Sequence, residues 1–422
     1  MLSNPILLAI VKIAVALGGI MAAAAYFVLL ERRVAAWVQD RRGPNRVGVP
    51  MSLLSGKLKD WRLFGLGQPA ADGLKMILKE EYTPAHVDRR LFVIAPMIIM
   101  TAALSVFAVI PFGSVLPPLP ALGLTQPVSL TIAPGVDVGV IYVFALSSIA
   151  VYGVILGGWA SNNKYSFLGG LRSSAQMIAY EIPLGLGLLG VVVATGSLRF
   201  DDIIQRQAET GLWFALAQPL GFLVFVIAAF AEAGRLPFDL PECEQELIGG
   251  YHTEYAGMKL VLFLTAEFIH MITASFLIVI LFLGGWHLPG VGAGTDIGWG
   301  LALVRIAVLM LKVFFVIFFF MMIRWSWPRF RFDQLMALAW KIMLPLGLVN
   351  LVAVACLQEV QHPAYMNGWF PHAFGRWAPW AAAAGGWLVC VAALVVTALI
   401  GPTLGDNRPS RDLESYVIDS QL

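Results

Sequence analysis

The stretch LVLFLTAEFIHMITASFLIVI at residues 260–280 decides the fold class, because it is long and apolar enough to cross a lipid bilayer. Only two ionisable residues, Glu267 and His270, interrupt it, and they lie one helical turn apart. An ionisable side chain at the centre of a bilayer costs at least ~2.5 kcal/mol, so its presence there needs a reason. The stretch therefore predicts a membrane helix that carries a functional or structural pair of polar groups.

The composition extends this prediction to a protein with many spans. Of the 422 residues, 59% are hydrophobic and 13% are charged, whereas a soluble domain contains about 25% charged residues. Apolar runs predict about nine transmembrane helices, at residues 5–30, 91–111, 138–159, 178–195, 213–231, 257–283, 301–323, 337–357 and 378–400. We expect an all-α polytopic membrane protein that forms one transmembrane helical domain over residues 1–422.

The distribution of basic residues predicts the orientation of these spans. Segments after odd-numbered spans contain 20 of the 28 Lys and Arg residues, and segments after even-numbered spans contain 3. We therefore expect the N-terminus outside and the C-terminus in the cytoplasm. The long loop 31–90, the acidic loop 232–256 and the polar tail 401–422 would then all be cytoplasmic.

The loop 31–90 is expected to contain an amphipathic helix. Its segment QPAADGLKMILKEE places Leu74, Ile77 and Leu78 on one helical face. Asp72 and Lys75 lie on the opposite face. Such a helix would lie at the membrane interface or under a partner, and a simple interfacial anchor fits the pattern as well as a functional element does.

Acidic residues are concentrated in residues 231–255, AEAGRLPFDLPECEQELIGGYHTEY, which contain 6 of the 26 carboxylates of the chain. Asp239 and Glu242 fit a capping box at a helix N-terminus. Capping does not account for Glu244 and Glu246. Because crowded carboxylates repel one another and hold protons more tightly, we expect this stretch to change its protonation state.

More ionisable residues lie in or beside the predicted spans. Glu181 opens the span 178–195, and Glu232 closes the span 213–231. Arg305 and Lys312 are seven residues apart in one span, so they share a helical face. Groups of this kind either carry protons or form buried ion pairs that fix the helix register, and His270 taken alone fits a satisfied core histidine.

Several classes of site are not indicated by the sequence. Cys243, Cys356 and Cys390 are far apart, so they provide neither a CxxC pair nor a set of four cluster ligands. No GxGxxG motif follows a predicted strand, and no Walker motif is present. A net charge of +2 without a basic, aromatic-rich run argues against nucleic acid. We expect no redox cofactor, metal or nucleotide bound by this chain alone.

Four pieces of sequence, in order, resemble the membrane subunit beside the quinone site of respiratory complex I, called H in bacteria and 1 in mitochondria. They are ERRVAAWVQDRRGPNRVG, QPAADGLKMILKEE, AYEIPLGL and RLPFDLPECEQELIGGYHTEY. The resemblance implies a subunit of a proton-pumping NADH:quinone oxidoreductase in the bacterial inner membrane, with a quinone such as ubiquinone as substrate. It implies FMN and iron–sulfur clusters in partner subunits. It also implies contact with the peripheral subunits that carry the terminal cluster and with small and antiporter-like membrane subunits.

The resemblance also implies site residues. The quinone chamber would be lined or supported by Glu31, Arg32, Arg41, Arg46, Asp72, Lys75, Arg235, Asp239, Glu242, Glu244 and Glu246. The proton path would contain Glu181, Glu232 and Glu267, and the buried polar residues His270, Arg305 and Lys312 are candidates for the same path. VPMSLLSGKLKDWRLF at residues 49–64 looks like an insertion, and the last span and the tail are absent from the shortest family members.

Three alternatives remain open on the sequence. The chain could be the homologous subunit of an energy-converting hydrogenase or related dehydrogenase, with a different electron donor or acceptor. It could also be a stand-alone ion transporter that uses Glu267 and Lys312, or a structural anchor for peripheral subunits. The buried charges argue against the last of these.

Overall fold

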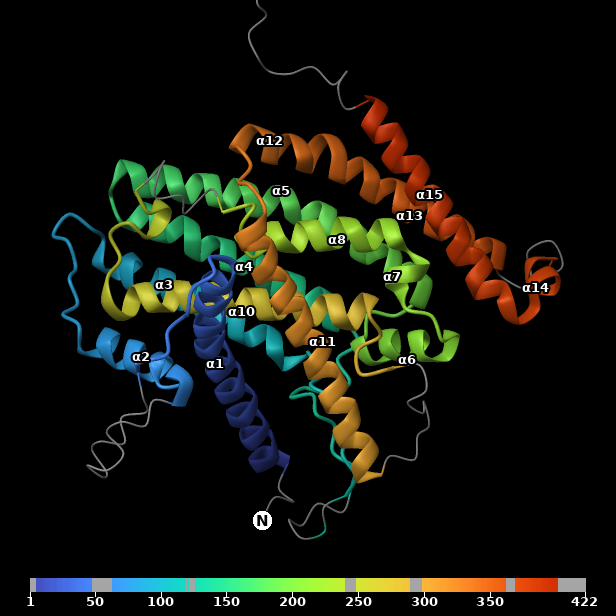
Figure 1. The fold of residues 1–422 in the computed structure, drawn as a ribbon, viewed down its shortest axis with the longest axis horizontal. Helices are drawn as coiled ribbons and strands as arrows, with labels where there is room; N and C mark the ends of the chain where they lie inside the picture. The colour runs from blue at the N-terminus through green and yellow to red at the C-terminus, as the bar shows by residue number, and fades with distance from the viewer. Residues whose placement is uncertain are drawn as a thin grey trace, which may run out of the picture.

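Helices form nearly all of the regular structure (Figure 1). The computed structural model describes residues 5–47, 63–118, 120, 126–239, 248–288, 298–361 and 369–400. The longer helices are α1 (Pro5–Val38), α3 (Arg89–Ser105), α4 (Gly139–Ala160), α5 (Lys164–Thr195), α8 (Pro219–Glu232), α10 (Gly257–Phe282), α11 (Trp299–Ser326), α13 (Leu344–Gln361) and α15 (Ala378–Ile400). The shorter ones are α2 (Gln68–Leu78), α6 (Phe200–Thr210), α7 (Phe214–Ala217), α12 (Phe332–Ala337) and α14 (Trp369–Phe374).

Eight of the described helical segments are long and apolar enough to cross a membrane, which confirms the all-α polytopic fold. The span predicted at residues 213–231 differs, because it is divided into α7 and the 14-residue helix α8. The break falls at Gln218, whose φ of −133° and ψ of 64° are not helical. Pro219 has no N–H and disfavours the helical conformation of the residue before it, so the helix begins anew there.

The span predicted at residues 178–195 is the second half of a longer helix, α5, which contains 32 residues. Its N-terminus is capped by Asn163, whose side chain accepts a hydrogen bond from the Tyr165 N–H at 3.0 Å. Small and polar residues in its first half concealed this helix from a search for apolar runs, yet they are buried against α4 and Gly250. Glu181 therefore lies in the middle of α5 and does not open a span as expected.

Helix α10 is the centre of the molecule. Every residue from Met271 to Phe282 is buried, and α10 packs against α1, α3, α8 and α11. Figure 1 shows α3, α4, α5, α8 and α10 running alongside one another, while α1 and α11 cross them at an angle. The apolar stretch that indicated a membrane protein is thus also the helix around which the others pack.

The short helices lie at opposite ends of this bundle. Helix α2 lies at one end, beside the C-terminal part of α1, and α6 and α14 lie at the other end (Figure 1). The turn that leads into α10 packs against α5 at the same end as α2 through Gly169, where an added Cβ atom would lie 2.6 Å from the Gly250 backbone. This close approach places the end of the acid-rich stretch directly against α5.

Candidate functional site

A buried carboxylate lies between two arginines near the C-terminal end of α1. Glu31 Oε2 accepts a hydrogen bond from Arg235 Nη1 at 3.1 Å, and Glu31 Oε1 accepts one from Arg324 Nη1. Glu31 is 8% exposed and Arg235 is 6% exposed. We call these three residues the Glu31 junction, because they hold α1, α11 and the segment after α8 at one point.

Arg235 has hydrogen-bonding capacity that the described residues do not use. Its guanidinium lies 4.1 Å from the ring centroid of Phe268, and its Nε and Nη2 groups are buried without a hydrogen-bond partner among the described residues. Gln176 fixes the backbone on either side, since its Nε2 donates to the carbonyls of Ala231 at 2.9 Å and Phe238 at 2.8 Å. Arg235 is therefore held in place with donors that suit an anionic or carbonyl-bearing group.

Helix α2 is tied to α1 by a second ion pair. Arg32 Nη1 donates to Asp72 Oδ2 at 2.9 Å, and Gln68 Nε2 donates to Asp72 Oδ1 at 2.9 Å. None of the residues of α2 is buried, so its apolar face is not covered by the described chain. The predicted amphipathic helix is confirmed, with exposed apolar residues at Leu74, Ile77 and Leu78.

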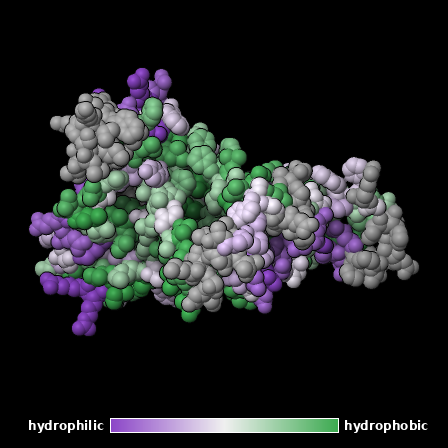
Figure 2. Space-filling model, turned by 90° about the horizontal axis from the view of Figure 1, so that it is seen from below, coloured by the Kyte–Doolittle hydropathy of each residue, from purple (hydrophilic) through white to green (hydrophobic). Residues whose placement is uncertain are grey.

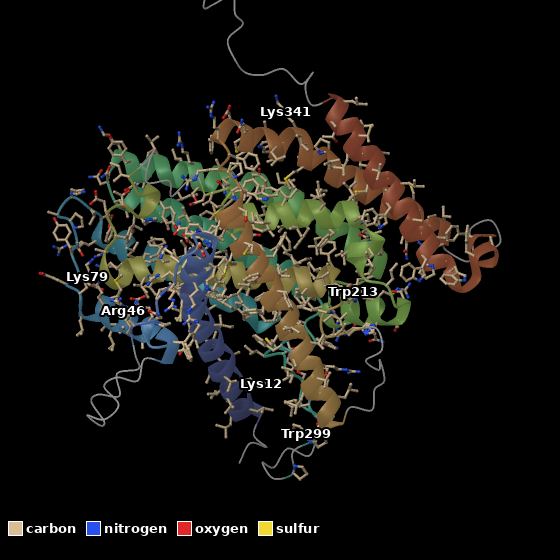
Figure 3. The ribbon with its side chains drawn as sticks, viewed as in Figure 1. Lys12, Arg46, Lys79, Trp213, Trp299 and Lys341 are labelled. Atoms are coloured by element: carbon tan, nitrogen blue, oxygen red, sulfur yellow. The ribbon has the colours of Figure 1, made fainter. Side chains whose placement is uncertain are left out.

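The other residues predicted for the chamber do not join the Glu31 junction. Asp239 Oδ2 accepts from Arg329 Nη2 at 3.4 Å. Arg41, Arg46 and Lys75 are exposed, and Figure 3 shows Arg46 at the same end of the molecule as Lys79. The remaining predicted chamber residues, Glu242, Glu244 and Glu246, lie outside the described residues, as does most of the insertion at 49–64. The expected capping box is thus described only at Asp239.

Two of the predicted proton-path acids meet a histidine at a small cavity. A cavity of about 40 Å³ is lined by Glu232 from α8 and by Glu267 and His270 from α10. Tyr251, in the turn before α10, also lines it and donates its hydroxyl to Glu267 Oε1 at 3.1 Å. The helical spacing of Glu267 and His270 thus places both beside Glu232, although the helix α8 that bears Glu232 is far from them in sequence.

A second cavity, of about 20 Å³, lies beside the first. It shares Glu232 and His270 with the first cavity and adds Ser147 from α4. The next residue on α4, Ser148, donates its hydroxyl to Glu181 Oε1 on α5. Glu181 itself lines neither cavity, so its link to the other two acids runs only through neighbouring residues of α4.

The cavities are large enough for water. A water molecule needs roughly 10–15 Å³ of this kind of volume and two or more polar partners. Glu232 and His270 line both cavities and supply such partners.

Arg305 and Lys312 of α11 lie outside the two cavities. Lys312 Nζ donates to the carbonyls of Leu283, Gly285 and His287 at 2.6, 3.0 and 2.7 Å, at the C-terminal end of α10. Burial lowers the pKa of His287, and the charges of Lys312 and Arg305 lower it further. The charges of both basic residues thus reach His287 in the turn after α10, but neither residue lines the two cavities.

Four residues that the structure places at these sites were not singled out from the sequence: Ser148, Gln176, Tyr251 and Arg324. Each has a signal in the sequence. Ser148 and Gln176 are neutral polar residues in or beside apolar runs, and such residues in a membrane usually bond across helices. Tyr251 lies within the acid-rich stretch itself, and Arg324 immediately follows a predicted span.

Metal ligands do not gather in the part of the chain that the structure describes, where no group of three or more His, Cys, Asp or Glu side chains is placed to hold an ion. Cys390 is buried and Cys356 is exposed. Cys243 lies outside the described ranges. That the chain holds no redox cofactor of its own stays a prediction.

The fold and the sites together define a polytopic membrane protein with a buried Glu31 between two arginines and with three partly buried acids on α5, α8 and α10. Over residues 11–355 the chain matches the family model for NADH dehydrogenase. The chain belongs to this NADH dehydrogenase family. The match ends within α13, so α14 and α15 lie beyond it.

Relatives of nearly full length give the same assignment. The chain is 45% identical over 356 residues to the H subunit of the NADH-quinone oxidoreductase of Leptospira biflexa, and the match covers 83% of this chain and 93% of that protein. It is 46% identical over 345 residues to NADH-quinone oxidoreductase subunit 8 of Thermus thermophilus, with 82% and 85% covered. The H 1 subunit of the NADH-quinone oxidoreductase of Cytophaga hutchinsonii is 45% identical over 336 residues, with 79% and 92% covered. The resemblance stated from the motifs is confirmed.

Proposed function

We propose that the chain is the membrane subunit of a proton-pumping NADH:quinone oxidoreductase that forms the quinone chamber together with the peripheral arm. The observation that carries this proposal is the Glu31 junction. It lies at the end of the bundle that bears α2, and it holds Arg235 at the start of the acid-rich stretch. The names of the relatives support the oxidoreductase over a hydrogenase subunit or a stand-alone transporter.

We assign the predicted chamber residues to substrate binding, to the positioning of α2 and to charge sensing. The two donor groups of Arg235 that have no acceptor among the described residues are suited to a quinone carbonyl or to a carboxylate of the acid-rich stretch. The ion pair of Arg32 with Asp72 would hold α2 against α1, so that the exposed apolar face of α2 guides an apolar substrate. Arg41, Arg46, Lys75 and Asp239 would lie at the chamber rim, with Glu242, Glu244 and Glu246 as the groups that sense the charge of the quinone.

Quinone reduction adds negative charge that attracts protons, and nearby carboxylates respond through their protonation. The cavities lined by Glu267, His270 and Glu232 would pass this response toward Glu181. Arg305 and Lys312 would support the path only indirectly, because Lys312 binds the backbone at the far end of α10. The structural alternative, that these groups only fix the helix register, is tested by the variants below.

The same proposal assigns the partner subunits, the membrane and the orientation of the chain. Electrons would reach the quinone from FMN and iron–sulfur clusters in partner subunits, and the acids would lead to the small and antiporter-like membrane subunits. The chain would lie in the bacterial inner membrane with its N-terminus outside. The end with the Glu31 junction would then face the cytoplasm and the peripheral arm.

Photo-labelling of the purified complex with an azido-quinone, followed by peptide mapping, tests the chamber. We expect labelled peptides from the loop 31–90 and from residues 232–256, and excess unlabelled quinone should suppress them. Labels confined to α6, α14 and the connections beside them would show that the quinone does not bind at the Glu31 junction.

A further inference from the structure

A large apolar groove is lined by α1, α11, α10 and the chain at residues 112–117 and 128–132, apart from the sites described above. Its volume is about 900 Å³, which is near the upper end of the range for small-molecule sites. Neither Glu31 nor any of the three intramembrane acids lines it. Figure 1 shows that α1 and α11 diverge toward their N-terminal ends, and Figure 2 shows hydrophobic residues gathered over the left half of the face seen from below.

One wall of the groove is long. On α1 its wall is a stripe at three- and four-residue spacing: Leu8, Val11, Val15, Gly19, Ala23 and Phe27. At 1.5 Å per residue this stripe extends over roughly 28 Å. Met310, Phe314 and Ile317 of α11 form part of the opposite wall. An apolar channel of this length fits a hydrocarbon chain better than a compact ligand.

One residue of the wall is charged. Lys12, near the N-terminal end of α1, is the only charged side chain among the described residues that line the groove. Its Nζ donates to the Thr131 carbonyl at 3.2 Å, and an ammonium group has three donors. Figure 3 shows Lys12 in the lower part of the view, where α1 and α11 are apart. A partly buried cation with free donors beside hydrocarbon favours an anionic partner.

We propose that this groove binds one anionic phospholipid, with its phosphate on Lys12 and an acyl chain along the Leu8 to Phe27 stripe. The negative charge of the phosphate distinguishes a phospholipid from a quinone or a partner helix as the occupant of the groove. A quinone has the apolar tail but no negative charge for Lys12, and a helix of a partner subunit would have to bring an acid to the same point. A phospholipid supplies both groups in one molecule and is present at high concentration in the membrane.

Two adjacent glycines provide a matched test. A Cβ atom added at Gly18 or at Gly19 meets no atom within 4 Å, so both positions tolerate a larger side chain. Only Gly19 lines the groove. Gly19→Leu therefore fills the groove, whereas Gly18→Leu adds the same side chain to the same turn of α1 outside it.

The intact complex is placed in phosphatidylcholine nanodiscs that contain a trace of phosphatidylglycerol with a diazirine on its acyl chain. After illumination, we expect labelled peptides from α1 and α11 along the groove. Gly19→Leu should lower this labelling about tenfold, the effect of losing a well-fitting chain, and Gly18→Leu should leave it unchanged. Equal labelling of both variants and of the unaltered complex would overturn the proposal.

The headgroup is tested separately. Lys12→Gln should remove the preference for phosphatidylglycerol over an equally labelled phosphatidylcholine probe, and Lys12→Arg should keep it. No preference in the unaltered complex would refute an anionic ligand, and labelling suppressed by added quinone would identify the groove as a quinone-tail site. A groove that resists every lipid probe in the complex is covered by protein, which would also refute the proposal. These readouts do not depend on enzyme activity.

Discussion

Glu31 is the residue on which the junction at the end of α1 depends. Glu31→Gln would leave Arg235 and Arg324 without their shared counter-charge, and losing one partner of a buried ion pair costs about 3–5 kcal/mol. We expect a clear fall in the temperature at which the purified complex loses this subunit or its activity.

Arg32→Gln is the matched control for this experiment. It breaks the pair with Asp72, whose side chain is 35% exposed while that of Arg32 is 49% exposed. An exposed pair contributes about 0–1 kcal/mol, so this variant should be nearly as stable as the unaltered complex. Equal destabilisation by the two changes would contradict the assignment of the junction as a buried structural centre.

Glu267 is the acid whose role in proton movement is easiest to isolate. Glu267→Gln keeps an oxygen that accepts the Tyr251 hydroxyl but cannot bind and release a proton. We expect proton pumping in vesicles to fall at least about tenfold, while NADH oxidation with an artificial acceptor is retained.

The control acid for Glu267 is Glu254, which accepts a hydrogen bond from Asn163 Nδ2 at 2.6 Å and lines neither cavity. Glu254→Gln should leave pumping nearly unchanged. Normal pumping by Glu267→Gln in an assembled complex would instead support a purely structural role for the buried acids.

At the scale of the helix, Lys312 acts as an external cap for α10. Its three hydrogen bonds satisfy the carbonyl of Leu283, the C-cap residue of the central helix, and the carbonyls of Gly285 and His287 in the turn that follows. Lys312→Met would leave these carbonyls unpaired, at a cost of about 1–3 kcal/mol for a buried group. We expect lower thermal stability but undiminished pumping per assembled complex, and a pumping defect in a fully stable variant would place Lys312 on the proton path.

The turn that Lys312 binds also gives a pH-dependent stability. Burial and the charges of Lys312 and Arg305 hold the pKa of His287 below its ordinary value of 6.5. The unfolded chain therefore binds a proton at His287 more readily than the folded chain does. The stability that neutral His287 contributes is present above pH 6.5 and is lost as the pH falls toward the lowered pKa of His287. Thermal inactivation compared at pH 7.5 and about pH 5.5 should show a smaller pH effect in His287→Gln than in the unaltered complex.

At the scale of the whole molecule, the orientation is open to direct measurement. With the native cysteines replaced by serine, Lys164→Cys at the start of α5 and Gln205→Cys on α6 introduce thiols at two exposed positions. The excess of basic residues on one side predicts that a membrane-impermeant maleimide reaches position 205 from outside and position 164 only in inverted vesicles. The opposite pattern would reverse the proposed orientation.

Hydropathy predicted most spans correctly because lipid contact requires a long apolar segment wherever a helix crosses. It missed the first half of α5, where small and polar residues are covered by α4 and so need no apolar character. It also merged α7 with α8, because mean apolarity does not register the break that Pro219 imposes. The errors therefore occur where packing or backbone geometry, rather than lipid, determines the helix.

The membrane class, the family and the candidate acids can be read from the sequence alone, since these depend on local composition and on motifs that follow one another along the chain. Which charges meet depends on the folded chain. Glu31 pairs with arginines that are 204 and 293 positions away in the chain, and Glu232 reaches His270 only because α8 packs on α10. Periodicity gives the face of a helix but not the helix that covers it. The Glu31 junction, the two cavities and the apolar groove thus follow from packing.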